Sequence, residues 1–226
     1  MGKEKYPRTY HLPFSEGVNS DDKVKKDLSS FEGEEIVVSE KLDGENTTLY
    51  NNFMHARSIS SPTNFTRNWV SKMHSVLKFD IPENIRLVGE NLWAEHAIFY
   101  PDNYLEGYFY LFSVFENKKG VDFCLSYEEV VEYSIILDLP MPKVFYRGIF
   151  EEEKIKNIAK NLNTKNVEGF VVRKTKEFKT EHFSDCVVKW VRKNHIQNSN
   201  ENWLKNAKQN GKLKKEVKPY YMRGSK

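Results

Sequence analysis

The alternation of hydrophobic and polar residues along the chain predicts strands interspersed with a few helices. Short runs rich in β-branched and aromatic residues, which are typical of strands, occur at residues 36–38, 47–50, 53–58, 85–93, 108–115, 167–173 and 186–192. Hydrophobic residues three and four positions apart predict helices at residues 67–78, 127–137, 150–162 and 196–209. Ser126 and Ser20 can cap a helix, which supports the one from residue 127 and predicts a further short one at 21–28. The mixture indicates an α+β fold.

Composition limits the class of protein. The chain has 226 residues, of which 39% are hydrophobic, so it can bury the core of one large domain, or of one domain with an appendage. Its apolar runs are shorter than the ~20 residues of a membrane span, and its first residues do not resemble a signal peptide. Cys124 and Cys186 are flanked by apolar residues, so we expect buried, reduced thiols. We therefore expect a monomeric cytoplasmic protein without membrane contact, in the host cytoplasm if a phage encodes it.

Charge is distributed unevenly along the chain. From residue 189 to the end there are eleven Lys or Arg against two Glu, whereas the chain before it carries a net charge of −6. Such a block is often only solvated surface, but it also suits a phosphate polymer as partner. We divide the chain into a catalytic body, residues 1–192, and a basic helical extension, residues 193–226. On this view the extension contacts nucleic acid and is dispensable for chemistry in the body.

A lysine follows the first predicted strand in a turn that can present it to a ligand. The sequence Lys41-Leu42-Asp43-Gly44 comes after the apolar run 36–38, and residues 47–50 are placed to form the hairpin partner of that run. A free lysine has a pKa of about 10.4, so deprotonating it at pH 7 costs roughly 4–5 kcal/mol. A nucleophilic Lys41 would need cationic neighbours or desolvation to lower its pKa. The alternative reading is an ordinary surface turn, because Asp-Gly favours hairpins.

Further charged residues lie at the edges of apolar strands: Arg57, Glu90, Glu168 and Lys189. Each alone is compatible with the solvent face of a sheet. An ionised group on a core strand is costly unless it is paired or coordinates something. Together with Asp43, the set therefore suits a site for phosphate and metal.

These segments resemble, in order, the motifs of the covalent nucleotidyltransferase superfamily, which contains ATP-dependent DNA and RNA ligases, NAD-dependent ligases and mRNA capping enzymes. The similar segments are Lys41–Gly44 (motif I), Val88–Leu92 (III), Tyr110–Phe115 (IIIa), Val167–Arg173 (IV) and Val187–Trp190 (V). The lead-in Tyr6–Thr9 with His11 looks most like the phage and bacterial RNA ligase branch. The resemblance implies an ATP-grasp-like domain built on antiparallel sheets with flanking helices.

The resemblance also implies a role for each candidate residue. Lys41 would attack the α-phosphate of ATP to form lysyl-AMP, with Lys189 contacting that phosphate and, together with Mg²⁺, lowering the pKa of Lys41. Phe112 would stack on adenine and Arg57 would bind ribose or a nucleic-acid phosphate. The implied catalytic residues are Lys41, Asp43 and Lys189; the cofactor-binding residues are Glu40, Lys41, Arg57, Glu90, Phe112, Glu168 and Lys189; and the ligands of Mg²⁺, or alternatively Mn²⁺, are Asp43, Glu90 and Glu168.

The implied function is an ATP-dependent RNA ligase, which transfers AMP to an RNA 5′-phosphate and seals it to a 3′-hydroxyl. Two alternatives stay open: a DNA ligase without an OB domain, acting on a DNA-containing duplex, and a nucleic-acid-binding protein that has the ligase fold without sealing activity. The roughly thirty residues after motif V are too few for an OB barrel, so we expect no OB domain.

Two departures from the family pattern concern the phosphate and adenine sites. Motif V commonly carries a second lysine two residues from the first, whereas Val187 and Val191 flank Lys189 here, leaving Arg192 or Lys193 as substitutes. Ser113 stands where many relatives have an aspartate.

Several other residues invite a functional reading for which a structural one is simpler. We expect Trp190 and Trp203 in the core, Arg173 paired with a carboxylate, and His11, His96 and His195 at the surface or satisfied within the fold.

Overall fold

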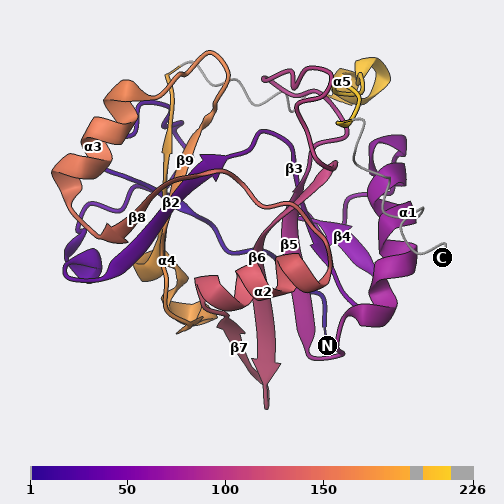
Figure 1. Cartoon of the computed structure of the whole chain (residues 1–226), viewed down its shortest axis with the longest axis horizontal. Helices are drawn as coiled ribbons and strands as arrows, with labels where there is room; N and C mark the ends of the chain where they lie inside the picture. The colour runs from indigo at the N-terminus through magenta and orange to yellow at the C-terminus, as the bar shows by residue number, and fades with distance from the viewer. Residues whose placement is uncertain (1, 194–200, 215–226) are drawn as a thin grey trace.

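Two β-sheets form the body of the protein (Figure 1). The computed structural model describes residues 2–193 and 201–214. The first sheet has the order β1-β11-β9-β2-β8, with β1 at Tyr10–His11, β11 at Val187–Val191, β9 at Gly169–Lys174, β2 at Glu35–Lys41 and β8 at Val144–Ile149. Neighbouring strands are antiparallel except for β1 and β11, which are parallel.

The second sheet is antiparallel throughout and has the order β10-β7-β6-β5-β3-β4. Its strands are β10 (Phe178–Lys179), β7 (Val121–Cys124), β6 (Phe109–Lys118), β5 (Ile85–Asn91), β3 (Glu45–Leu49) and β4 (Met54–Ala56). The chain crosses from the first sheet to the second at residues 42–44, between β2 and β3. Motif I therefore lies where the two sheets are joined.

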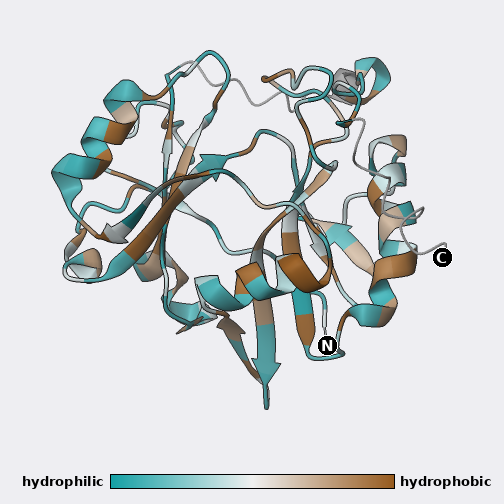
Figure 2. Ribbon diagram, viewed as in Figure 1, coloured by the Kyte–Doolittle hydropathy of each residue, from teal (hydrophilic) through white to brown (hydrophobic). Residues whose placement is uncertain are grey.

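Helices cover the outer faces of both sheets (Figure 1). Helix α3 (Glu152–Asn161) packs Ile155 into the core of the first sheet, and α1 (Asn68–Leu77) and α2 (Tyr127–Ile136) contribute to the core of the second. In Figure 2, α3 is largely hydrophilic, as expected of a helix with one buried face. The remaining helices are α4 (Phe183–Cys186), α5 (Glu201–Asn206) and four 3₁₀ turns at Ser29–Phe31, Phe65–Arg67, Lys78–Asp80 and Thr180–His182.

A further hydrophobic cluster ties the two sheets together. Val88 and Phe115 of the second sheet pack in it with Val187 of the first and with Phe183 of α4. Cys124 and Cys186 are buried and free in the same cluster, which confirms the expected thiols. No helix among the described residues is long and apolar enough to cross a bilayer.

The predicted α+β class, with antiparallel sheets and flanking helices, is confirmed. Two local predictions are wrong. Residues 21–28 are not helical, because they run beside β1: the His11 N–H donates to Lys23 O (2.8 Å) and the Lys25 N–H to His11 O (2.9 Å). Residues 45–49 do form a strand, but it pairs with β4 and β5 rather than with β2, because the chain has already crossed to the second sheet.

Other differences concern missed strands and the end of the chain. The hydrophobic pattern does not predict β7, β8 or β10, the last of which is only two residues long. Helix α5 ends at Asn206, before the predicted end at residue 209, and the predicted residues 196–200 lie outside the described part of the chain. The division at residue 192 stays a prediction.

The cap of α2 gives a test of this local reading. The Ser126 hydroxyl accepts from the Glu129 N–H (3.3 Å), and the Glu129 carboxylate accepts from the Ser126 N–H (2.8 Å), a capping box. We predict that Ser126→Ala lowers the free energy of unfolding by about 1 kcal/mol, measured by urea denaturation. The control is Ser75→Ala, an exposed serine inside α1 whose change should stay within about 0.5 kcal/mol. Equal effects of the two substitutions would contradict the capping role.

Candidate active site

A cavity of about 440 Å³ lies between the two sheets and is lined by residues of both. Alternation along β2 produces its floor. Val37, Ser39 and Lys41 line the cavity, whereas Ile36 and Val38 point to the opposite face, into the core beneath α3. On the neighbouring strands, Val171 and Arg173 of β9 and Val187 and Lys189 of β11 line the same floor. A strand with one face in the core thus presents its polar residues to the cavity.

The second sheet supplies the opposite wall. Glu90 of β5 and Phe112 and Ser113 of β6 line the cavity there. The ring of Phe112 is half-buried, and Tyr6 packs edge-on against it with centroids 5.4 Å apart. Tyr6 thus holds the ring of Phe112 in place at the wall of the cavity.

Lys41 forms an ion pair with Glu168 across the first sheet. Lys41 Nζ lies 2.5 Å from Glu168 Oε2, and the Glu168 side chain is 1% exposed. The pairing register places Lys41 opposite Gly169, next to Glu168. A Cβ at position 169 would lie 2.0 Å from the carbonyl oxygen of Trp190, so only glycine permits this approach of β9 to β11. The glycine of motif IV thus brings the buried carboxylate to the lysine.

The side chains around Lys41 do not lower its pKa, so the lowering that the resemblance implies, which includes Mg²⁺, stays a prediction. Burial lowers it, but Glu168, Glu90 and Asp43 outweigh burial, and the pKa lies above its ordinary value. Lys189 is also affected, because burial and the charge of Lys41 lower its pKa. The side chains alone hold Lys41 as an ammonium ion.

For the carboxyl groups of Glu90 and Glu40, burial affects the pKa more than nearby positive charges do. Burial raises the pKa of Glu90 to about 8; Lys41 opposes the shift, and Glu168 and Asp43 add to it. The Gly44 N–H donates to its Oε1 (3.1 Å). Glu40 is buried, its Oε1 has no hydrogen-bond partner among the described residues, and burial raises its pKa. Both carboxyls line the cavity and can accept from, or coordinate, a ligand.

Asp43 lies behind the cavity lining and binds the loop after β5. Its Oδ2 accepts from the Ile98 N–H (2.7 Å), and its own N–H donates to the Tyr100 hydroxyl (3.0 Å). Within residues 2–193 and 201–214, no three His, Cys, Asp or Glu residues form a group suited to holding a metal ion. The geometry gives Asp43 a structural duty beside the predicted catalytic one.

The N-terminal segment closes one side of the cavity and was not predicted from sequence. Arg8 and Asp22 line it. Asp22 lies between two basic side chains: its Oδ1 is 3.7 Å from Lys189 Nζ, and its Oδ2 is 3.3 Å from His11 Nε2. Burial lowers the pKa of His11 to about 4. The expected substitute for the second lysine of motif V, Arg192, instead donates to Thr164 O (2.8 Å).

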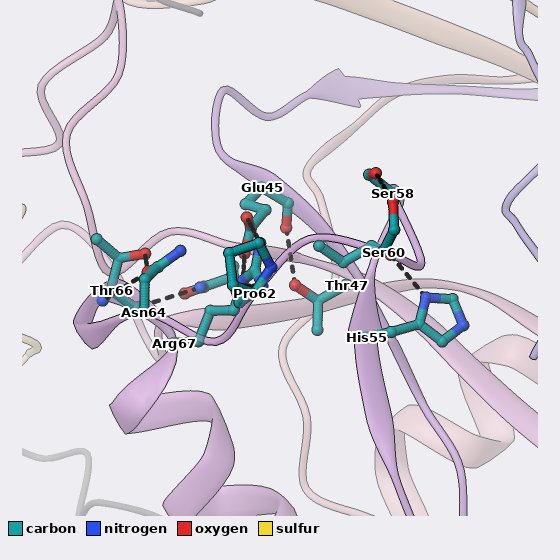
Figure 3. A network of polar contacts seen from close by, with 11 residues as sticks. Glu45, Thr47, His55, Ser58, Ser60, Pro62, Asn64, Thr66 and Arg67 are labelled. Atoms are coloured by element: carbon teal, nitrogen blue, oxygen red, sulfur yellow. Dashed lines mark hydrogen bonds and ion pairs between the residues drawn. The ribbon is translucent and has the colours of Figure 1, made fainter. Parts of the chain in front are cut away.

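A loop after β4 carries Arg57 to the rim, where it is exposed and lines the cavity. Figure 3 shows how Arg67 holds this loop: its Nε and Nη2 donate to the two oxygens of Glu45, both at 2.6 Å. Its Nη1 donates to the Pro62 carbonyl (2.9 Å). The Asn64 side chain caps the following 3₁₀ turn at the Thr66 N–H (3.0 Å). Arg67 thereby links the loop to Glu45, directly after motif I.

The remaining predictions divide as follows. Trp190 is in the core, stacked on Phe170 with centroids 5.5 Å apart, as predicted. The predicted carboxylate partner of Arg173 is wrong: its guanidinium donates to the carbonyl oxygens of Leu125 and Lys174. His96 lines the cavity, which residue type alone did not indicate. His195 and the side chain of Trp203 lie outside the described part of the chain.

The fold and the cavity define a member of the covalent nucleotidyltransferase superfamily. A profile of the RNA ligase family matches residues 34–191, well over half of the chain, so the protein belongs to that family. A search of curated proteins by sequence gives no match.

Solved structures show the same fold. An archaeal ATP-dependent RNA ligase (form 2) matches 83% of this chain and 48% of its own, with 16% identity and a TM-score of 0.55. A Naegleria gruberi RNA ligase with PPi matches 83% and 57%, with 16% identity and a TM-score of 0.52. A putative ATP-dependent DNA ligase from Aquifex aeolicus matches 77% and 49%, with 22% identity and a TM-score of 0.50. The chain thus spans about half the length of the structures that it matches.

The Arg67–Glu45 contact can be tested against an exposed pair of the same kind. We predict that Arg67→Lys lowers the free energy of unfolding by about 1.5–3 kcal/mol, because a lysine cannot make both hydrogen bonds to the carboxylate. Limited proteolysis should also cut residues 57–66 faster. The control is Arg147→Lys, because the side chains of Arg147 and its partner Glu35 are both more than 40% exposed. We expect it to lower the free energy of unfolding by less than about 1 kcal/mol. If Arg147→Lys lowered the free energy of unfolding more than Arg67→Lys does, the two hydrogen bonds from Arg67 to Glu45 would not be of particular importance for stability.

Proposed function

We propose that the protein is an ATP-dependent RNA ligase that works through a covalent lysyl-AMP. The observation that carries the proposal is the Lys41 amine, ion-paired with buried Glu168 inside a cavity that Lys189, Arg57 and Phe112 also line. Membership of the RNA ligase family supports the reaction class.

The cavity suits a nucleotide. Its volume of about 440 Å³ falls in the range of small-molecule sites. Phe112 offers a ring for adenine. The carboxylate oxygen of Glu40 that has no partner in the described part of the chain offers an acceptor to a donor on the nucleotide. Lys189, Arg57 and Arg8 supply positive charge for phosphates. These contacts suggest that the base lies against the second sheet and that the phosphates lie toward the first.

The carboxyls also suit a divalent cation. Glu90 is a hard oxygen donor, half-buried at the cavity wall, and burial together with the charges of Glu168 and Asp43 raises its pKa. Mg²⁺ commonly takes one or two protein carboxylates together with substrate phosphates and water, so it does not need a complete cluster of protein ligands. Glu90, Glu168 and Asp43 would hold Mg²⁺ or Mn²⁺ through its water molecules rather than as three direct ligands, and the ion would neutralise charge at the reacting phosphate.

In the first step, Lys41 Nζ forms a bond to the α-phosphorus of ATP while the bond to pyrophosphate breaks. Glu168, hydrogen-bonded to the amine, is placed to accept the proton that leaves. Lys189 stabilises the charge on the phosphate oxygens. AMP then passes to the 5′-phosphate of RNA, freeing Lys41, and a 3′-hydroxyl displaces AMP to seal the strands.

Self-labelling tests the proposal. We predict that the protein incubated with Mg²⁺ and ATP labelled at the α-phosphate gains an acid-labile label, and that GTP gives none. Lys41→Ala should abolish the label because it removes the nucleophile. The control is Lys154→Ala, an exposed lysine of α3, which should label as the wild type does.

The outcomes separate the alternatives. Labelling that survives Lys41→Ala would refute the mechanism, and labelling from GTP would indicate a guanylyltransferase. Nucleotide binding without any label would favour the nucleic-acid-binding alternative. Sealing assays on RNA and DNA nicks in parallel then decide between RNA and DNA as substrate.

A further inference from the structure

The last described residues pack against the loop that follows β5. We call residues 207–214 the C-terminal strap and residues 92–106 the β5–β6 loop. Five backbone hydrogen bonds join them. The Glu95 N–H donates to Lys208 O (2.8 Å), the Asn210 N–H to Trp93 O (2.9 Å) and the Gly211 N–H to Tyr100 O (2.7 Å); the other two run from the Asn103 N–H to Lys212 O (2.8 Å) and from the Lys214 N–H to Leu105 O (3.0 Å). The strap is therefore part of the folded body, although the sequence places it in the basic extension.

Asn210 is the buried centre of this contact. Its side chain is 3% exposed and makes three hydrogen bonds to backbone groups of the β5–β6 loop. Nδ2 donates to Leu92 O (2.9 Å) and Ala94 O (3.0 Å), and Oδ1 accepts from the Tyr100 N–H (3.0 Å). The carboxamide of asparagine is needed here, because the side chain must donate two hydrogen bonds and accept one.

The residues next to Asn210 leave the strap little freedom to shift. A Cβ on Gly211 would lie 2.2 Å from the carbonyl carbon of Pro101, so the strap and the loop are in contact through their backbones. The buried Tyr108 hydroxyl donates to Gly211 O (2.9 Å) and accepts from Gln209 Nε2 (2.7 Å). The loop is thus fixed on the side away from the cavity.

The other side of the same loop belongs to the candidate active site. The Ile98 N–H binds Asp43 Oδ2, the Tyr100 hydroxyl binds the Asp43 N–H, and His96 lines the cavity. Tyr100 is common to both contacts, since its N–H binds Asn210 and its hydroxyl binds Asp43. A shift of the loop would therefore move His96 and disturb the turn that carries Lys41.

We propose that Asn210 is a positioning residue for adenylyl transfer, acting through the β5–β6 loop on His96, Asp43 and the Lys41 turn. The inference rests on the proposed function and deepens it. It also replaces the expectation that everything after residue 192 is dispensable for the nucleotide chemistry. A misplacement of about 1 Å in a reacting group can slow catalysis by about 100-fold, so a loop held from behind is sufficient to affect the rate.

The test is Asn210→Asp, which keeps the size of the side chain but places a carboxylate against the carbonyl oxygens of Leu92 and Ala94. We expect self-adenylylation at saturating ATP to slow by roughly 10- to 100-fold. Hydrogen exchange should become faster at the amides of the β5–β6 loop and stay unchanged in β2. The matched control is Asn161→Asp, an exposed asparagine of α3 that makes one hydrogen bond to a carbonyl, for which neither quantity should change.

If Asn210→Asp does not fold, Tyr108→Phe removes only the hydroxyl between Gly211 and Gln209, and we expect about fivefold slower labelling. A wild-type labelling rate in a folded variant whose loop exchanges faster would show that the strap is merely structural. Unchanged exchange would show that Asn210 does not hold the loop. A wild-type protein that takes up no label would overturn the proposed function and with it the catalytic role of Asn210, whereas the exchange comparison would still decide whether Asn210 fixes the loop.

Discussion

The ion pair between Lys41 and Glu168 is the interaction on which the rest of the site depends. A carboxylate that is 1% exposed costs free energy unless a cation compensates it, and the Lys41 amine at 2.5 Å does so. The contact requires β9 to lie beside β2 with Gly169 opposite Lys41, and it requires Gly169 itself, since any Cβ there would collide with Trp190. The same carboxylates that compensate the lysine also raise its pKa. A lysine so placed needs further positive charge nearby before it can act as a nucleophile.

Side chains alternate between the two faces of the first sheet, which explains how a second positive charge comes to lie near Lys41. One face of the first sheet packs Ile36, Val38 and Phe170 beneath α3, so the residues between them must point into the cavity. Lys189 lies on the face of the first sheet that lines the cavity, where burial lowers its pKa. The second sheet contributes Glu90 and Phe112 from the other side, because the chain crosses between the sheets directly after Lys41. Two ordinary half-buried sheets thus create one site with opposite walls.

Sequence reasoning found the residues on strands and missed those that long-range contacts bring in. Lys41, Glu90 and Lys189 line the cavity, because a charged residue within an apolar strand pattern leaves few other places for its side chain. Phe112 lines it too, but only the family resemblance indicated that residue. The predicted hairpin between residues 36–38 and residues 47–50 was wrong, because that prediction considered only segments that are neighbours in sequence. Asp22 and His96 reach the site on loops, and the strap supports the loop that carries His96 from the side away from the cavity. The hydrophobic pattern carries no information on such loops. Their positions depend on hydrogen bonds such as that from Tyr100 N–H to Asn210, 110 residues away.

Charge composition and local packing give different answers for the end of the chain. The Lys and Arg residues after 188 suggest an arm for a phosphate polymer, and that suggestion takes account of net charge alone. Asn210, however, is neutral and buried, and its side chain donates to the backbone carbonyls of Leu92 and Ala94. A free arm would not bury an amide with three hydrogen bonds, because the burial would gain nothing for a segment that must leave the body to bind RNA. The stretch around Asn210 is therefore better understood as part of the body, and a role in binding nucleic acid has to be sought in the exposed basic side chains beside it.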